Sequence, residues 1–177
     1  MSKNIYNVWR NRVKTSEVSE TLEVSGIGNL DLLDLPLLGI FASVKCPARL
    51  ILAAHDAAKG ISAQGNAVIS SFQSPTEKEM LAVLLRGPSP IVICPARGLE
   101  GMRIPVDWQQ KIEEGLLLVI SPFPAHIKRP KPETILKRNQ LVAQWSSELL
   151  IIHAESGGKV EKIVEEVSSA GKKLHRL

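Results

Sequence analysis

The sequence of 177 residues has few aromatic side chains, only two cysteines and no hydrophobic run long enough to span a membrane. Aromatic residues make up 4% of the chain, so few side chains are available for stacking on nucleic-acid bases. A membrane-spanning helix needs about 20 apolar residues, and the N-terminal segment MSKNIYNVWRNRVK is polar and basic, unlike a secretory signal. We therefore expect no membrane partner, a reducing cytoplasmic compartment and no structural disulfide.

Sequence motifs of the common catalytic sites are also missing. The chain has no Walker loop, no G-x-G-x-x-G and no G-x-S-x-G elbow. His126, His153 and His175 lack metal-ligand spacing with each other and with the cysteines, and His55 is predicted to be a surface or packing residue of a helix. We therefore interpret the chain as a binding protein rather than an enzyme, with no catalytic residues, no cofactor and no metal.

Short apolar runs alternate with helical patterns along most of the chain. The hydrophobic share of 44% and the charged share of 23% are typical of a globular domain. Strands are predicted at residues 37–42, 67–70, 91–94, 116–120 and 149–153, with a weaker one near 173–177. Helices are predicted at residues 48–63, 76–86, 106–114, 132–146 and 159–170. Runs that are apolar throughout indicate strands buried on both faces of a sheet.

This alternation predicts an α/β domain with a doubly wound, mostly parallel sheet and helices on both faces. Residues 36–177 form this single domain, and residues 1–35 are predicted to be an N-terminal extension that packs onto it. The segment SPTEKE supports one helix start, because Ser74 can cap a helix that has Pro75 at its first position and Glu77 three residues after the cap.

Ligands of such sheets bind at the carboxyl ends of the strands, near the point where strand order reverses. This rule directs attention to the loops at residues 43–47, 71–75, 95–103, 121–130 and 154–159. The net charge of +4 is mildly basic and permits an anionic partner.

The segment HAESGGKVEKIVEEV combines a strand end, a glycine-containing loop and a helix start. Backbone N–H groups around Ser156, Gly157 and Gly158, with Lys159 at the helix start, could hold an anion. The same glycines would also suit a tight strand-to-helix turn that binds nothing. Both interpretations remain open from spacing alone.

Three further segments place phosphate-binding side chains at strand ends. HIKRPKPETILKRNQ contributes Lys128, Arg129 and Arg138, unless these form only a solvated charged face. CPARGLEGMRIP contributes Arg97 and Arg103, unless either pairs with a nearby glutamate. SSFQSPTEKE contributes donors from the residues Ser71 and Ser74, although the latter could serve only as a helix cap.

The tetrapeptide CPAR occurs twice, each time just after a predicted strand. In the expected strand order, the first and third strands are separated by the second, which puts Cys46 and Cys94 about 10 Å apart. That separation exceeds disulfide reach. We therefore interpret the repeat as one structural solution used twice, with Lys45 and Arg97 facing the same crevice.

The segments KRNQLVAQWSSELLIIHAESGG and GLLLVISPFP resemble the Rossmann-like domain of the DNA-processing protein A family, and more distantly the lysine-decarboxylase-like LOG group. In the family, an Arg-Asn pair opens a helix that precedes a hydrophobic strand and a Ser-Gly loop. Arg138, Asn139, Ser156 and Gly157 occupy these positions here, and Lys45 is loosely similar to an arginine that follows the family's first strand.

The resemblance implies a protein that holds single-stranded DNA in a basic pocket and acts in DNA uptake and recombination. It further implies a homodimer, a recombinase of the RecA type as partner, and no catalytic reaction. Two alternatives remain open. The pocket could take a nucleotide or a nucleotide derivative, as a sensor or a LOG-type enzyme, or the chain could be a structural partner that has lost its ligand.

Overall fold

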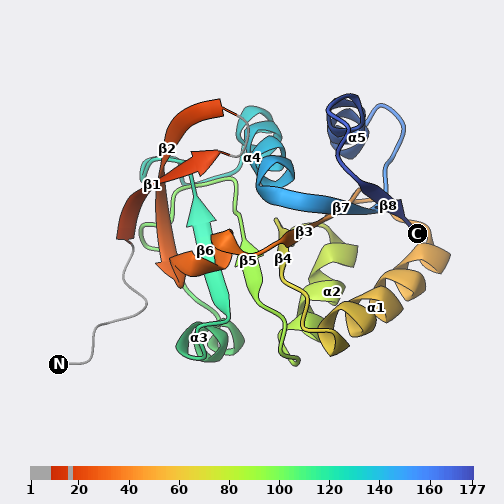
Figure 1. The fold of residues 1–177 in the computed structure, drawn as a ribbon, viewed down its shortest axis with the longest axis horizontal. Helices are drawn as coiled ribbons and strands as arrows, with labels where there is room; N and C mark the ends of the chain where they lie inside the picture. Colours follow the sequence, from red (N-terminus) through yellow and green to blue (C-terminus); the bar gives the residue numbers. More distant parts are fainter. Residues whose placement is uncertain (1–8, 16–17) are drawn as a thin grey trace.

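The computed structural model describes residues 9–15 and 18–177, so residues 1–8 and 16–17 of the predicted extension lie outside the described residues. One sheet runs through the middle of the molecule, with strand order β1-β2-β6-β5-β4-β3-β7-β8 (Figure 1). Its strands are β1 Trp9–Thr15, β2 Val18–Gly28, β3 Leu37–Ala42, β4 Val68–Ser70, β5 Ile91–Ile93, β6 Leu117–Ser121, β7 Ser146–His153 and β8 Leu174–Arg176.

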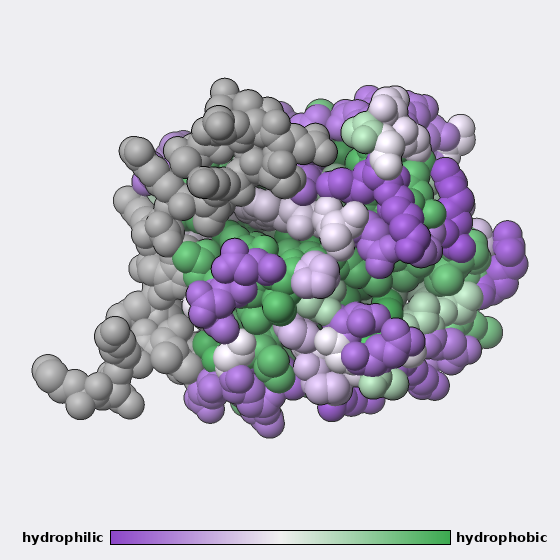
Figure 2. Space-filling model, in the orientation of Figure 1, coloured by the Kyte–Doolittle hydropathy of each residue, from purple (hydrophilic) through white to green (hydrophobic). Residues whose placement is uncertain are grey.

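Helices cover both faces of this sheet. They are the 3-10 helix η1 Leu30–Asp34 and the α-helices α1 Ala48–Ala63, α2 Pro75–Leu84, α3 Val106–Glu113, α4 Pro132–Trp145 and α5 Lys159–Ser169. One hydrophobic cluster joins the sheet to α1, α2 and α3, and a second joins the opposite face to α4, α5 and η1. In this orientation hydrophobic residues gather in the middle of the visible face, with hydrophilic residues around them (Figure 2).

Burial on both faces explains why the strands are apolar throughout. In β7, Leu149 and Ile151 face the α4–α5 side, whereas Leu150 and Ile152 face the α1–α2 side. Strands β3 to β8 pair in parallel. The predicted doubly wound, mostly parallel α/β fold is confirmed, and the predicted strands and helices from residue 37 onward agree with the structure to within a few residues.

The segment before residue 36 contributes strands that the sequence did not predict. β1 and β2 form an antiparallel hairpin, and β2 continues the sheet by pairing antiparallel with β6. Val24 and Ile27 of β2 and Leu32 of η1 are buried in the core. The division of the chain at residue 36 stays a prediction, but this segment shares the sheet of the residues that follow it.

Strand order reverses beside β3. From β3 the chain adds β4, β5 and β6 on one side, and it then crosses back to add β7 and β8 on the other. β3 is followed by α1 on one face and β7 by α5 on the opposite face. The carboxyl ends of β3 and β7 therefore form the crevice at which doubly wound sheets bind ligands.

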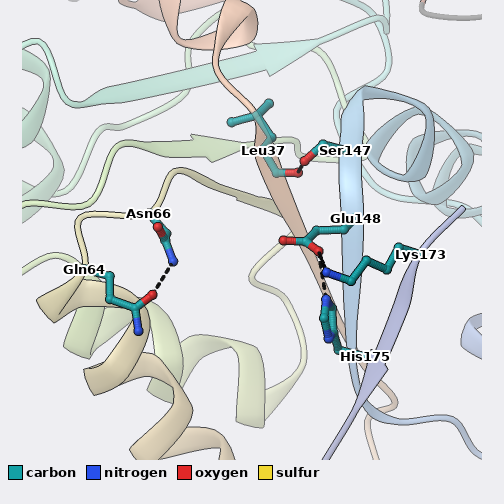
Figure 3. A network of polar contacts seen from close by, with 7 residues as sticks. All are labelled: Leu37, Gln64, Asn66, Ser147, Glu148, Lys173 and His175. Atoms are coloured by element: carbon teal, nitrogen blue, oxygen red, sulfur yellow. Dashed lines mark hydrogen bonds and ion pairs between the residues drawn. The ribbon is translucent and has the colours of Figure 1, made fainter.

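The opposite, amino edge of the sheet holds a small ion-pair cluster (Figure 3). The Glu148 carboxylate lies 3.0 Å from Lys173 Nζ and 2.8 Å from His175 Nε2. These hydrogen bonds, from His175 first and Lys173 second, lower the pKa of Glu148. The cluster joins β7 to the C-terminal strand β8, away from the crevice.

Candidate functional site

A pocket of about 350 Å³ lies in the crevice between β3 and β7. The loops after β3, β4 and β7 form its walls, and α4 closes it from the side of the second hydrophobic cluster. Its lining residues are Phe41, Ala42, Ser43, Val44, Ser71, Gln73, Ser74, Glu77, Ile135, Arg138, Asn139, Glu155, Gly158, Lys159 and Val160.

Arg138 of α4 is the cation at the base of this pocket. Arg138 is only 5% exposed. Nε donates a hydrogen bond to Asn139 Oδ1 at 2.7 Å, and Nη1 donates to the Cys94 carbonyl at 3.2 Å. Nη2 has no hydrogen-bond partner among the described residues. Burial lowers the pKa of the guanidinium, and the nearby Cys94 and Glu77 act against that shift.

Glu77 of α2 supplies a buried carboxylate that joins two strand-end loops. Its Oε1 accepts from the Ala42 N–H at 3.0 Å, and its Oε2 accepts from the Ser71 hydroxyl at 2.8 Å and the Gln73 N–H at 3.0 Å. Burial raises the pKa of this carboxyl, while these hydrogen bonds and the charge of Arg138 oppose the rise. Because its partners are donors to both oxygens, we assign Glu77 as a carboxylate.

Two helix N-termini border the pocket. Ser74 caps α2, and the predicted capping box with Glu77 is confirmed. Gly158 caps α5 without a side-chain hydrogen bond. Helix N-termini carry positive partial charge and unpaired N–H groups, so both suit an anion. In the α5 loop, however, the Gly157 N–H already donates to the Glu161 carboxylate at 2.6 Å.

An ion pair lies at the rim between the loops after β3 and β7. Lys45 Nζ is 3.7 Å from Glu155 Oε1, and both side chains are exposed. The Glu155 N–H donates to Ser43 Oγ at 2.9 Å, which ties the two loops together. The apolar part of the wall includes Val44, which is 72% exposed, and Ile135.

The predicted site residues fall into two groups in the structure. Six of them line the pocket: Ser71, Ser74, Arg138, Asn139, Gly158 and Lys159. Lys45 lies at the rim through its pairing with Glu155, and Ser156 and Gly157 belong to the same loop as Glu155 without lining the pocket.

The other four predicted residues, Arg97, Arg103, Lys128 and Arg129, lie on the loops after β5 and β6 and do not line the pocket. We call the two loops that carry these four residues the outer basic loops. Gly98 allows the two loops to meet, because a Cβ at this position would lie 2.5 Å from the Pro124 carbonyl. Its N–H donates to the Ile127 carbonyl at 2.8 Å, and Lys128 Nζ donates to the Glu100 carbonyl at 3.0 Å.

Four polar lining residues were not among the predicted site residues: Ser43, Gln73, Glu77 and Glu155. Ser43, Gln73 and Glu155 fall in strand-end loops that the sequence singled out, so their position was a usable signal. Glu77 was interpreted only as part of a helix cap. Its role in joining two strand-end loops depends on the N–H of Ala42, which is 35 residues away in the chain.

The described residues contain no group of three or more histidine, cysteine, aspartate or glutamate residues that could hold a metal ion. Both cysteines, Cys46 and Cys94, are free. Burial raises the pKa of the Cys94 thiol to about 12. In the part of the chain that the structure describes, no helix is long and apolar enough to cross a membrane.

Comparisons with known proteins agree with this architecture. The family model described as DNA recombination-mediator protein A matches residues 19–163. A solved structure that concerns the single-stranded DNA binding mode of DNA processing protein A from Helicobacter pylori is similar, with a TM-score of 0.75 and 17% identity over 96% of this chain and 79% of that chain.

The structure of DNA processing protein A from Streptococcus pneumoniae has a TM-score of 0.72 and 16% identity. That match covers 87% of this chain and 54% of the Streptococcus chain, so the present chain spans about half the length of that relative. At these identities the two structures establish the similarity of fold. No curated protein matches the sequence.

Proposed function

This chain belongs to the DNA recombination-mediator protein A family, and we propose that it binds single-stranded DNA by holding a backbone phosphate in the pocket between β3 and β7. The observation that carries the proposal is the buried Arg138, whose Nη2 has no partner among the described residues and which lies in the pocket beside two helix N-termini. A phosphate oxygen satisfies such donors.

The remaining cations extend this binding site along the same edge of the sheet. Lys45 and Lys159 lie at the pocket, and the outer basic loops follow the next two strands. A polymer with regularly spaced phosphates can contact several of these loops at once, whereas a single nucleotide cannot. This arrangement favours a nucleic-acid chain over a small anion as the ligand.

Few aromatic side chains are available to stack on bases. The one aromatic residue of the pocket lining, Phe41, is 3% exposed. Binding therefore depends mainly on phosphate contacts, which tolerate any sequence and weaken with salt. We propose a binding protein without catalytic chemistry. A second copy of the chain and a recombinase of the RecA type remain the protein partners that we propose from the family resemblance.

The test is the salt dependence of binding to an oligothymidylate of about 15 nucleotides, followed by fluorescence anisotropy. Each phosphate neutralised on a single strand contributes about 0.7 to the slope of log affinity against log salt. Three to six contacts at the pocket and the outer basic loops give an expected slope of about −2 to −4. A flat response between about 50 and 300 mM salt would contradict the proposal.

A further inference from the structure

The pocket is not basic, although it lies among basic loops. Its lining contains two cations, Arg138 and Lys159, and two acidic side chains, Glu77 and Glu155. Lys45 at the rim is itself paired with Glu155. Within the lining the two cations and the two carboxylates therefore balance before any ligand enters, and Lys45 adds one positive charge at the rim.

The Glu77 carboxylate is fixed by hydrogen bonds, whereas Glu155 is fixed at its backbone and its exposed side chain pairs with Lys45 at the rim. Glu77 accepts hydrogen bonds from the ends of both strand loops, as described above. Glu155 is held through its backbone, because its N–H donates to Ser43 Oγ at 2.9 Å across the crevice. Glu155 thus presents a carboxylate at the mouth, and Glu77 presents one at the base.

The attractive groups of the pocket suit one negative charge. Arg138 is the buried cation of the lining, and the two N–H groups of its Nη2 have no partner among the described residues. Lys159 is exposed, and the two helix N-termini offer partial charges only. An internal phosphodiester carries one negative charge. A terminal phosphate monoester carries about 1.5 to 2 near pH 7, since its second pKa is about 6.

We propose that Glu155 is a specificity-determining residue, which makes the pocket accept the singly charged phosphodiester of a chain interior and disfavour a doubly charged terminal phosphate. The inference rests on the proposed function, because it assumes that a phosphate enters this pocket. It also separates DNA binding from the nucleotide-binding alternative, whose ligands end in a terminal phosphate.

Two small competitors that differ by one methyl group test this directly. Thymidine 5′-monophosphate is a monoester, and its methyl ester is a diester with the same base and sugar. Each is titrated at pH 7.5 against a labelled oligothymidylate bound to the protein. We expect the methyl ester to displace the label at a concentration at least three-fold lower than the monophosphate.

The variant Glu155→Gln tests the residue. In water, which is the appropriate medium for an exposed side chain such as Glu155, one carboxylate and one additional ligand charge about 6 Å apart interact by an amount worth about three-fold in affinity. The variant should bind both competitors more tightly than the unmodified protein does. The ratio of the affinity for the methyl ester to that for the monophosphate should fall by that factor. Glu165→Gln is the matched control, because this exposed residue of α5 does not line the pocket. It should leave the ratio unchanged.

Lowering the pH to 5.0 gives an independent arm. The monophosphate then loses its second charge, so its disadvantage should disappear in the unmodified protein. The other ionisable groups at the site are Glu77, Glu155, Arg138 and Lys159 in the lining, Lys45 at the rim and His153 at the end of β7. The methyl ester reports the effect of these groups and serves as the reference.

The outcomes separate the two proposals. If the labelled oligothymidylate does not bind, both the proposed function and this inference are overturned. If it binds, the inference alone is overturned by any of three results: a monophosphate that competes as well as its ester at pH 7.5, a ratio that Glu155→Gln leaves unchanged, or failure of both small ligands to compete at millimolar concentration. Thermal unfolding of each variant checks that it is folded.

Discussion

Lys159 provides the cleanest single test of the phosphate site. It is the first residue of α5, lines the pocket and is exposed, so its replacement should not disturb the core. Lys159→Ala removes one charge from the pocket and leaves the helix in place, because alanine has the highest helix propensity. The buried Arg138 cannot be removed so simply, since Asn139 and the Cys94 carbonyl would lose their partner.

The expected loss follows from the exposure of Lys159. Two unit charges 4 Å apart interact by about 1 kcal/mol in water and by about 4 kcal/mol at the effective dielectric of a protein surface. An exposed lysine belongs near the lower value, and about 1 kcal/mol corresponds to an affinity about five-fold lower. Loss of one phosphate contact should also reduce the magnitude of the log–log salt slope by about 0.7.

The assay is fluorescence anisotropy of a labelled oligothymidylate at four salt concentrations between about 50 and 300 mM. Lys162→Ala is the matched control, because it removes the same charge from the next turn of the same helix, at an exposed position that does not line the pocket. Its affinity should change less than two-fold. If the two variants lose affinity equally, the positive charge of α5 as a whole attracts the DNA, and the assignment of the pocket as the phosphate site would be wrong.

Three further predictions concern the same architecture. Arg138→Ala should weaken binding of all DNA sequences alike by at least ten-fold, measured by anisotropy on oligonucleotides of different composition, with a circular-dichroism melt to verify folding; a sequence-dependent loss would contradict phosphate recognition. In the native protein a thiol reagent at pH 8 should modify the partly buried Cys46 and leave Cys94 unmodified until denaturant is added. The reason is that Cys94 is fully buried and burial raises the pKa of its thiol to about 12. Rapid modification of both thiols would contradict this burial. The folded-state pKa of Glu148 is lowered, so its contribution to stability is present above its unfolded pKa of about 4.3 and is lost as the pH falls through the folded value. The melting temperature of Glu148→Gln should therefore lie below that of the unmodified protein at pH 6 and approach it below pH 3. A difference that persists at pH 3 would contradict the ion-pair cluster with His175.

The fold was largely predictable because its strands are buried on both faces. A strand such as β7 must be apolar at successive positions when alternate residues enter different clusters, and that run is visible in the sequence without any partner. The hairpin of β1 and β2 was not predicted. β2 lacks a continuous apolar run, because Ser25 and Gly26 separate Val24 from Ile27, and its pairing with β6 depends on residues about 90 positions later in the chain.

The site was predictable only in part, for a related reason. The rule for strand ends pointed to Ser71, Ser74 and Lys159, which line the pocket, because a residue after a parallel strand lies at one known edge of the sheet. The rule does not say which loops meet. Glu155 and Ser43 come together because β7 pairs with β3, and this strand order is a property of the whole sheet rather than of either segment.

The separation of the pocket from the outer basic loops indicates how affinity and selectivity can be divided in this protein. The outer basic loops carry four cations, and no carboxylate pairs with any of them in the ion pairs found among the described residues. Counterions released from these loops would supply most of the salt slope and act on any polyanion. The pocket adds little net charge, because Glu77 and Glu155 offset its two cations. Under the proposed function, the pocket would accept a group of one charge and of the right shape, so that binding strength would come from the loops and the choice of ligand from the pocket.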